Sequence, residues 1–91
     1  MLFMTIYTYE PKEREAVIKR RLEQGAMTPP SMKIIGEWSA LGGGRVFRLV
    51  ETDDPQVMLG ATAAWADLGK IKVFPVMETE EVMKLISRKL P

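Results

Sequence analysis

The sequence contains no cysteine, no histidine and no asparagine. Without cysteine, the chain has no disulfides, thiolate nucleophiles or cysteine-ligated metal sites. Without histidine, it lacks the commonest metal ligand and the side chain whose ordinary pKa lies nearest neutrality. Any proton transfer would therefore need a carboxylate, a lysine or a tyrosine with a shifted pKa. We predict no metal site and no bound cofactor.

Long apolar runs and an excess of charge are also missing. No stretch approaches the roughly 20 apolar residues of a membrane-spanning helix. The opening MLFMTIYTYE has neither the basic segment nor the cleavage site of a signal peptide. Acidic and basic residues are interspersed and the net charge is +1, so charge favours neither nucleic acid nor a membrane surface. These features predict a cytoplasmic protein with no nucleic-acid and no membrane partner, and the length predicts a single domain, 1–91.

The most informative stretch is Met32–Thr52, in which two extended runs flank a triple glycine. Both runs are rich in β-branched and aromatic residues, which is typical of a β-hairpin. Gly42-Gly43 suits the positive φ angles at the centre of a tight turn. A turn of two or four residues places Glu37 opposite Arg48, whereas a three-residue turn pairs Trp38 with Arg48. The register therefore stays open.

Before the hairpin, the sequence predicts a strand and a helix. The strand Leu2–Tyr9 is apolar on both faces, so we expect it to be covered on both sides. Pro11 suits the first position of a helix, and Gly25 marks its end. That helix carries one narrow apolar stripe, formed by Val17, Ile18 and Leu22.

After the hairpin, the sequence predicts helix, strand and helix. Asp54 is suited to cap the helix Pro55–Leu68, which is apolar around most of its circumference and is expected to be buried on most sides. The strand Lys70–Met77 contains Pro75, which confines the strand to a sheet edge or marks a bulge. A last helix begins at Thr79 and has apolar side chains at helical spacing: Val82, Leu85, Ile86 and Leu90.

The order of these elements predicts an α+β, ferredoxin-like βαββαβ fold with an extra C-terminal helix. In its usual strand order the first and third strands are central and the fourth lies at an edge, which agrees with the apolar first strand and with Pro75. We expect the three helices to cover one face of the sheet. The other face would keep large apolar side chains, and the simplest cover is a second copy of the chain, which predicts a homodimer.

Three segments carry a resemblance to a known family: MLFMTIYTYEP, IGEWSALGGGRVFRLVETDDP and AAWADLGKIKVFPVMETEEV. They resemble small prokaryotic proteins of a domain-of-unknown-function family within the dimeric α/β barrel superfamily. The resemblance implies two ferredoxin-like sheets packed into an eight-stranded barrel with the helices outside. Relatives in that superfamily include cofactor-independent monooxygenases, haem-degrading enzymes and lactone isomerases. The haem-degrading members use an asparagine, a tryptophan and a histidine, of which this chain has only tryptophan, so the resemblance implies no particular reaction.

The candidate ligand-binding residues are Tyr7, Glu37, Trp38, Arg48 and Trp65. The aromatic rings can line a cavity and hydrogen-bond a planar ligand, or they can anchor the core or a dimer interface. Glu37 and Arg48 lie in the middle of their strands, where they can form a satisfied cross-strand ion pair. Alternatively, Arg48 binds an anion.

Three further patterns favour structural interpretations. The segment Gly42-Gly43-Gly44-Arg45 lacks the strand–loop–helix context of a phosphate-binding loop. Lys19-Arg20-Arg21 is expected to be a solvated helix end that complements the helix dipole. RNA-recognition modules share this strand order, but their third strand carries several aromatic residues where 45–50 carries one.

Our hypothesis from the sequence is a homodimer that binds a small apolar or aromatic molecule between the sheet and the helix Pro55–Leu68. One alternative is a cofactor-independent monooxygenase or isomerase, in which the aromatic candidates position a substrate and Glu37 or Arg48 supplies charge. The other is a structural or interaction dimer with a filled core and no ligand.

Overall fold

The computed structural model describes residues 1–89. Its elements, in chain order, are β1 (Leu2–Thr8), the 3-10 helix η1 (Pro11–Glu13), α1 (Arg14–Gln24), β2 (Lys33–Ser39), β3 (Arg45–Glu51), α2 (Pro55–Ala63), β4 (Lys70–Val76) and α3 (Thr79–Lys89). This order confirms the predicted ferredoxin-like βαββαβ arrangement with an additional C-terminal helix. Leu90, which we assigned to the last helix, lies outside the described residues.

The four strands form one antiparallel sheet in the order β2-β3-β1-β4. The first and third strands are therefore central and the fourth lies at an edge, as predicted. Pro75 lies opposite Phe3 on that edge strand. Because proline has no N–H to donate, an edge position spares the sheet a broken hydrogen bond.

The β2–β3 hairpin adopts the register that we expected for a turn of two or four residues, with Glu37 opposite Arg48. The N–H of Gly43 donates to the carbonyl of Ala40 at 2.9 Å and closes the turn. Positive φ angles occur at Gly43 (84°) and Gly44 (79°), one residue further along than we predicted. Glycine tolerates this left-handed conformation because it has no Cβ. The triple glycine thus belongs to a hairpin loop and precedes a strand.

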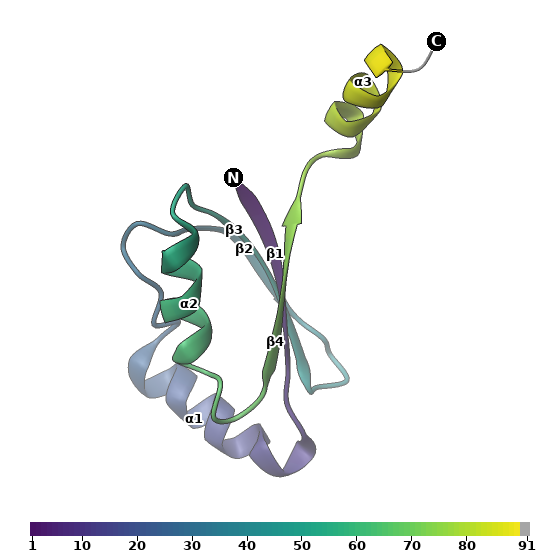
Figure 1. Cartoon of the computed structure of the whole chain (residues 1–91). Helices are drawn as coiled ribbons and strands as arrows, with labels where there is room; N and C mark the ends of the chain where they lie inside the picture. Colours follow the sequence, from purple (N-terminus) through teal and green to yellow (C-terminus); the bar gives the residue numbers. More distant parts are fainter. Residues whose placement is uncertain (90–91) are drawn as a thin grey trace.

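Helices α1 and α2 pack against the same face of the sheet (Figure 1). Between them and the strands lie two clusters of buried apolar side chains. One cluster joins α2 to β3 through Met58, Ala61 and Val50, together with Met32. The other joins β1, α1 and the turn after α2, and its members are Tyr7, Val17 and Trp65.

Two of our burial predictions are wrong. Helix α2 buries one side only, and the side chain of Leu59 on its outer side is 71% exposed. On α1, Val17 is buried while Ile18 and Leu22 are exposed. The physical reason is the same in both cases. A helix in a layer that covers one sheet has the sheet on one side and no further layer of the chain on the other.

Helix α3 does not join that layer. It continues beyond the end of β4 and points away from the sheet (Figure 1), which corrects our expectation that three helices cover one face. Its large side chains Met83, Leu85 and Ile86 are exposed. The molecule is accordingly elongated, with extents of 54 × 29 × 18 Å and a radius of gyration of 15.5 Å, against about 12 Å for a compact domain of this length.

The face of the sheet opposite α1 and α2 is apolar and open. Side chains alternate along a strand, and Phe3 and Tyr7 of β1 point toward the helices. The even-numbered residues of β1 therefore point to the opposite face, as do their partners on the neighbouring strands. The apolar side chains of the open face are Leu2, Met4, Ile6, Trp38, Phe47, Leu49, Phe74 and Val76, and Lys72 and Glu51 lie on the same face opposite Ile6 and Leu2. No element within residues 1–89 covers it (Figure 1), and Trp38 is 56% exposed. One chain alone therefore covers the central strand on one side.

Gly69 is expected to be intolerant of a side chain. A Cβ there would lie 2.5 Å from the Thr8 carbonyl oxygen and 2.7 Å from Cζ of Tyr7. Since one atom is backbone and the other belongs to a core ring, Gly69→Ala should lower the free energy of unfolding by about 1–3 kcal/mol, measured by urea denaturation. Gly42→Ala is the control, because its Cβ would have no atom within 4 Å. Equal losses in the two variants would contradict the packing explanation.

Candidate functional site

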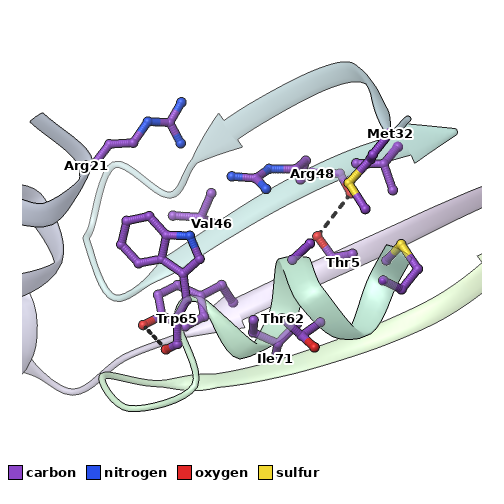
Figure 2. Close-up of a pocket in the computed structure, with 12 residues that line it drawn as sticks. Thr5, Arg21, Met32, Val46, Arg48, Thr62, Trp65 and Ile71 are labelled. Carbon is purple, nitrogen blue, oxygen red and sulfur yellow. Dashed lines mark hydrogen bonds between the residues drawn. The ribbon is translucent and has the colours of Figure 1, made fainter. Parts of the chain in front are cut away.

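A cavity of about 70 Å³ lies between the sheet and α2, with the end of α1 beside it (Figure 2). Most of its lining is apolar: Met32, Val46, Val50, Met58, Ala61, Trp65 and Ile71. The remaining lining residues bring polar atoms: Thr5, Tyr7, Arg21, Arg48 and Thr62. The cavity is therefore an apolar space with a few polar groups at its boundary, which is the usual character of a small-molecule site.

The spacing of residues along β3 and α2 explains which of their side chains line the cavity. Residues 46, 48 and 50 alternate along β3 and so share the face that meets the helices. On α2, residues 61 and 62 follow residue 58 by three and four positions and therefore lie on the same side of the helix as residue 58. Ala61 has no side chain beyond Cβ, and this small residue faces the cavity where a larger one would enter it.

The two aromatic rings of the cavity make hydrogen bonds to the backbone. The hydroxyl of Tyr7 donates to the carbonyl of Trp65 at 2.9 Å, and Nε1 of Trp65 donates to the carbonyl of Ala26 at 3.2 Å. The rings also contact each other edge to face, with their centroids 6.0 Å apart. Burial raises the pKa of Tyr7, and the nearby charge of Asp67 raises it further. The rings thus act as walls, and their polar hydrogens are already used.

Glu37 pairs with two arginines. Nε of Arg48 donates to Oε2 of Glu37 at 2.7 Å, and the guanidinium of Arg21 reaches Oε1 at 2.8 Å and Oε2 at 3.1 Å. Burial acts to raise the pKa of Glu37, but the hydrogen bonds from Arg21 and Arg48 outweigh it and hold that pKa below its usual range. The cross-strand pair is therefore extended by a residue of α1 into a triad that joins helix to sheet.

Arg20 also departs from the solvated helix end that we predicted. Its guanidinium makes two hydrogen bonds of 2.7 Å to the carboxylate of Asp67 and one of 3.0 Å to the carbonyl of Ala64. It also lies over the ring of Trp65, 5.6 Å from the centroid. These contacts tie α1 to the turn after α2, and the hydrogen bonds from Arg20 hold the pKa of Asp67 below its usual range.

The structure brings three of the five sequence candidates together. Tyr7, Arg48 and Trp65 line the cavity. Glu37 binds Arg48 without lining the cavity itself. Trp38 lies on the opposite, open face of the sheet, because it is adjacent to Glu37 and alternate residues of a strand point to opposite faces.

Sequence reasoning missed Arg21. The signal was present, because Arg20 and Arg21 follow the buried Val17 by three and four positions and so lie on the same side of α1 as the core. A long arginine side chain at such a position can reach over the edge of the core to an acidic partner. We instead read the three basic residues as one solvated group.

Residues 1–89 contain no cluster of three or more acidic, histidine or cysteine side chains arranged to hold a metal ion. Over the same residues, every helix is too short or too polar to cross a membrane.

Three comparisons with known proteins bear on the chain. A family model described as a domain of unknown function, DUF3303, matches residues 1–90. No curated protein matches the sequence. Among solved structures, a crystal structure from Deinococcus radiodurans, described as a candidate antibiotic biosynthesis monooxygenase, matches with 12% identity and a TM-score of 0.49, covering 86% of this chain and 93% of that one.

Proposed function

The chain belongs to the DUF3303 family, a domain-of-unknown-function family of the kind that its sequence segments predicted. Since that family has no assigned function, we propose one from the cavity. The protein binds a small apolar or aromatic molecule between its sheet and α2. The observation that carries this proposal is an apolar cavity that the chain's own side chains leave unfilled. An apolar cavity is a favourable site for an apolar guest, because water gains few hydrogen bonds there.

The size of the cavity limits the ligand. About 70 Å³ is roughly half the volume of an engineered apolar cavity of about 150 Å³ that binds benzene. Sites for drug-sized ligands are larger, at roughly 300–1,000 Å³. The cavity therefore encloses a short branched chain or part of one six-membered ring, and the rest of a ring would extend from the cavity's opening.

The lining favours binding over catalysis. None of the residues that line the cavity is an aspartate, a glutamate or a lysine. The hydroxyl of Tyr7 is held by a backbone carbonyl, and its raised pKa keeps it protonated at neutral pH. A general base for proton abstraction has to lie within hydrogen-bond reach of the substrate, and the lining supplies no such group.

We further propose that two copies assemble through the open faces of their sheets. Support comes from the apolar side chains that all four strands contribute to this face and from its exposure in the single chain (Figure 1). A two-fold axis would place the same surface of each copy against the other. The cavity lies on the helix side of the sheet, so this assembly leaves it open to ligands.

The binding proposal is tested by titrating the protein with benzamide and observing the indole N–H signals by NMR. Trp65 lines the cavity, while Trp38 lies across the sheet on the other face. The chain has two tryptophans, so each titration contains its own reference. We expect the Trp65 signal to move and the Trp38 signal to stay. If no single-ring probe, neutral or anionic, moves the Trp65 signal, the binding proposal is wrong.

Ala61→Leu is expected to abolish benzamide binding without destabilising the fold. The added carbons would occupy the cavity, and each buried methylene contributes about 0.8 kcal/mol, so the thermal midpoint should stay level or rise. Ala63→Leu is the matched control, because Ala63 lies on the same helix with its side chain exposed. A loss of about 1–3 kcal/mol in Ala61→Leu would instead indicate an already filled core, contradicting the cavity.

A further inference from the structure

Most of the polar hydrogens around the cavity are already used within the protein. The hydroxyl of Tyr7 donates to a backbone carbonyl, as does Nε1 of Trp65. The hydroxyls of Thr5 and Thr62 likewise donate to the backbone carbonyls of Arg48 and Leu59. A ligand therefore finds no free neutral donor among these four side chains.

Arg48, by contrast, has N–H groups that are not used within the described part of the chain. It is 14% exposed and lines the cavity from the centre of β3 (Figure 2). Its Nε and Nη2 atoms contact Glu37, and within residues 1–89 its Nη1 atom donates no hydrogen bond to the protein. A guanidinium has five N–H donors and no acceptor. The polar group that the cavity can recognise is consequently an acceptor.

The charge around Arg48 is also unbalanced. Arg21 and Arg48 both line the cavity, and both contact the single carboxylate of Glu37, which can balance only one of their two charges. Both oxygens of Glu37 are occupied by these contacts. The triad keeps one net positive charge in a site where most of the lining is apolar. Charged acceptors form shorter and stronger hydrogen bonds with guanidinium than neutral ones do.

We propose that the ligand is a small monocarboxylate with a single-ring or short branched apolar body, whose carboxylate binds Arg48 and Arg21 while the body fills the cavity. This inference rests on the proposed binding function and specifies the chemical class of the ligand. One negative charge matches the one unbalanced positive charge. The cavity volume fixes the size of the apolar part.

The test compares benzoate with benzamide, which has the same shape but no charge at neutral pH. We expect benzoate to bind roughly tenfold or more tightly at low salt, since a charge-assisted hydrogen bond replaces a neutral one. The readout is again the indole N–H signal of Trp65. If both compounds bind equally, or benzamide binds more tightly, the carboxylate inference is overturned while the binding function stands. If neither binds, both fail.

Arg21→Gln gives a second, independent measurement. Arg21 is 44% exposed, and its removal leaves the Arg48–Glu37 pair intact, so this variant is expected to fold. The triad then has no net charge, and the preference for benzoate over benzamide should fall to about twofold or less, since the pair that remains is neutral overall. Lys19→Met is the control, because it removes one positive charge from the exposed side of the same helix. An equal fall in both variants would show only a general charge effect and would overturn the assignment to Arg21 and Arg48.

Discussion

Phe47→Glu is expected to convert the proposed dimer to a monomer. Phe47 lies on the open face in the central strand β3, opposite Ile6 on one side and Trp38 on the other. A carboxylate buried in an apolar interface costs several kcal/mol, and two-fold symmetry introduces it twice. The dissociation constant should therefore rise by about a thousandfold or more. Sedimentation at micromolar concentration should give twice the 10.3 kDa chain mass for the wild type and one chain mass for the variant.

The control for this experiment is Leu59→Glu. Leu59 is a large apolar residue that lies outside the open face, on the outer side of α2, so the same charge there should leave the dimer intact. Circular dichroism would establish that both variants keep their secondary structure. A wild-type monomer would refute the dimer itself. A dimer that survives Phe47→Glu would place the interface on another surface.

Glu37→Leu is expected to destabilise the protein more than Arg48→Met. Without Glu37, the largely buried Arg48 loses the one carboxylate partner that it has within residues 1–89, and removing one member of a buried ion pair costs about 3–5 kcal/mol. Because Glu37 is 20% exposed, we expect a loss near the lower end, about 3 kcal/mol. Arg48→Met leaves Glu37 paired with Arg21 and puts an apolar side chain beside an apolar cavity, so its loss should be about 1 kcal/mol.

The double variant Glu37→Leu with Arg48→Met should cost less than the sum of the two single changes, since no charge is then left without its partner. Urea denaturation measures all three. The cost of Glu37→Leu should also depend on pH. The pKa of Glu37 is lower in the folded state, so its contribution is present above the unfolded pKa of about 4.3 and is lost as the pH falls through the folded pKa. Additive losses that do not change with acid would show that the charges are not coupled.

The sequence contained most of the information that determines the sheet. Pro75 predicted the edge strand, and the apolar residues of β1 on both parities predicted a central strand, because both signals depend only on the geometry of a strand. The burial of α2 and the position of α3 could not be predicted in this way. Apolar residues on all sides of a helix indicate that burying every side would be favourable. How many sides are in fact buried depends on how the whole chain and its partners pack around the helix.

The candidate site was predictable to the extent that local register determines it. A hairpin turn of two or four residues places Glu37 opposite Arg48, and the structure has this pairing. The approach of Arg21 depends on how α1 crosses the sheet, which strand pairing does not determine. Similarly, Tyr7 and Trp65 were recognised as cavity residues, but the carbonyls that accept their hydrogens come from Trp65 and Ala26. The positions of those carbonyls are set by turns that only tertiary packing defines.

The strand order β2-β3-β1-β4 also has a consequence for how the chain folds. Only the β2–β3 hairpin joins strands that are neighbours in sequence, so it is the part of the sheet that can form first at little entropic cost. Thr8 of β1 lies opposite Arg45 on one side and opposite Lys70 on the other, and both contacts require closure of a long loop. Folds dominated by such distant pairings fold more slowly than helical ones. The cavity, whose walls include β1, β3 and α2, can therefore take shape only after the first strand has docked onto a hairpin formed later in the sequence.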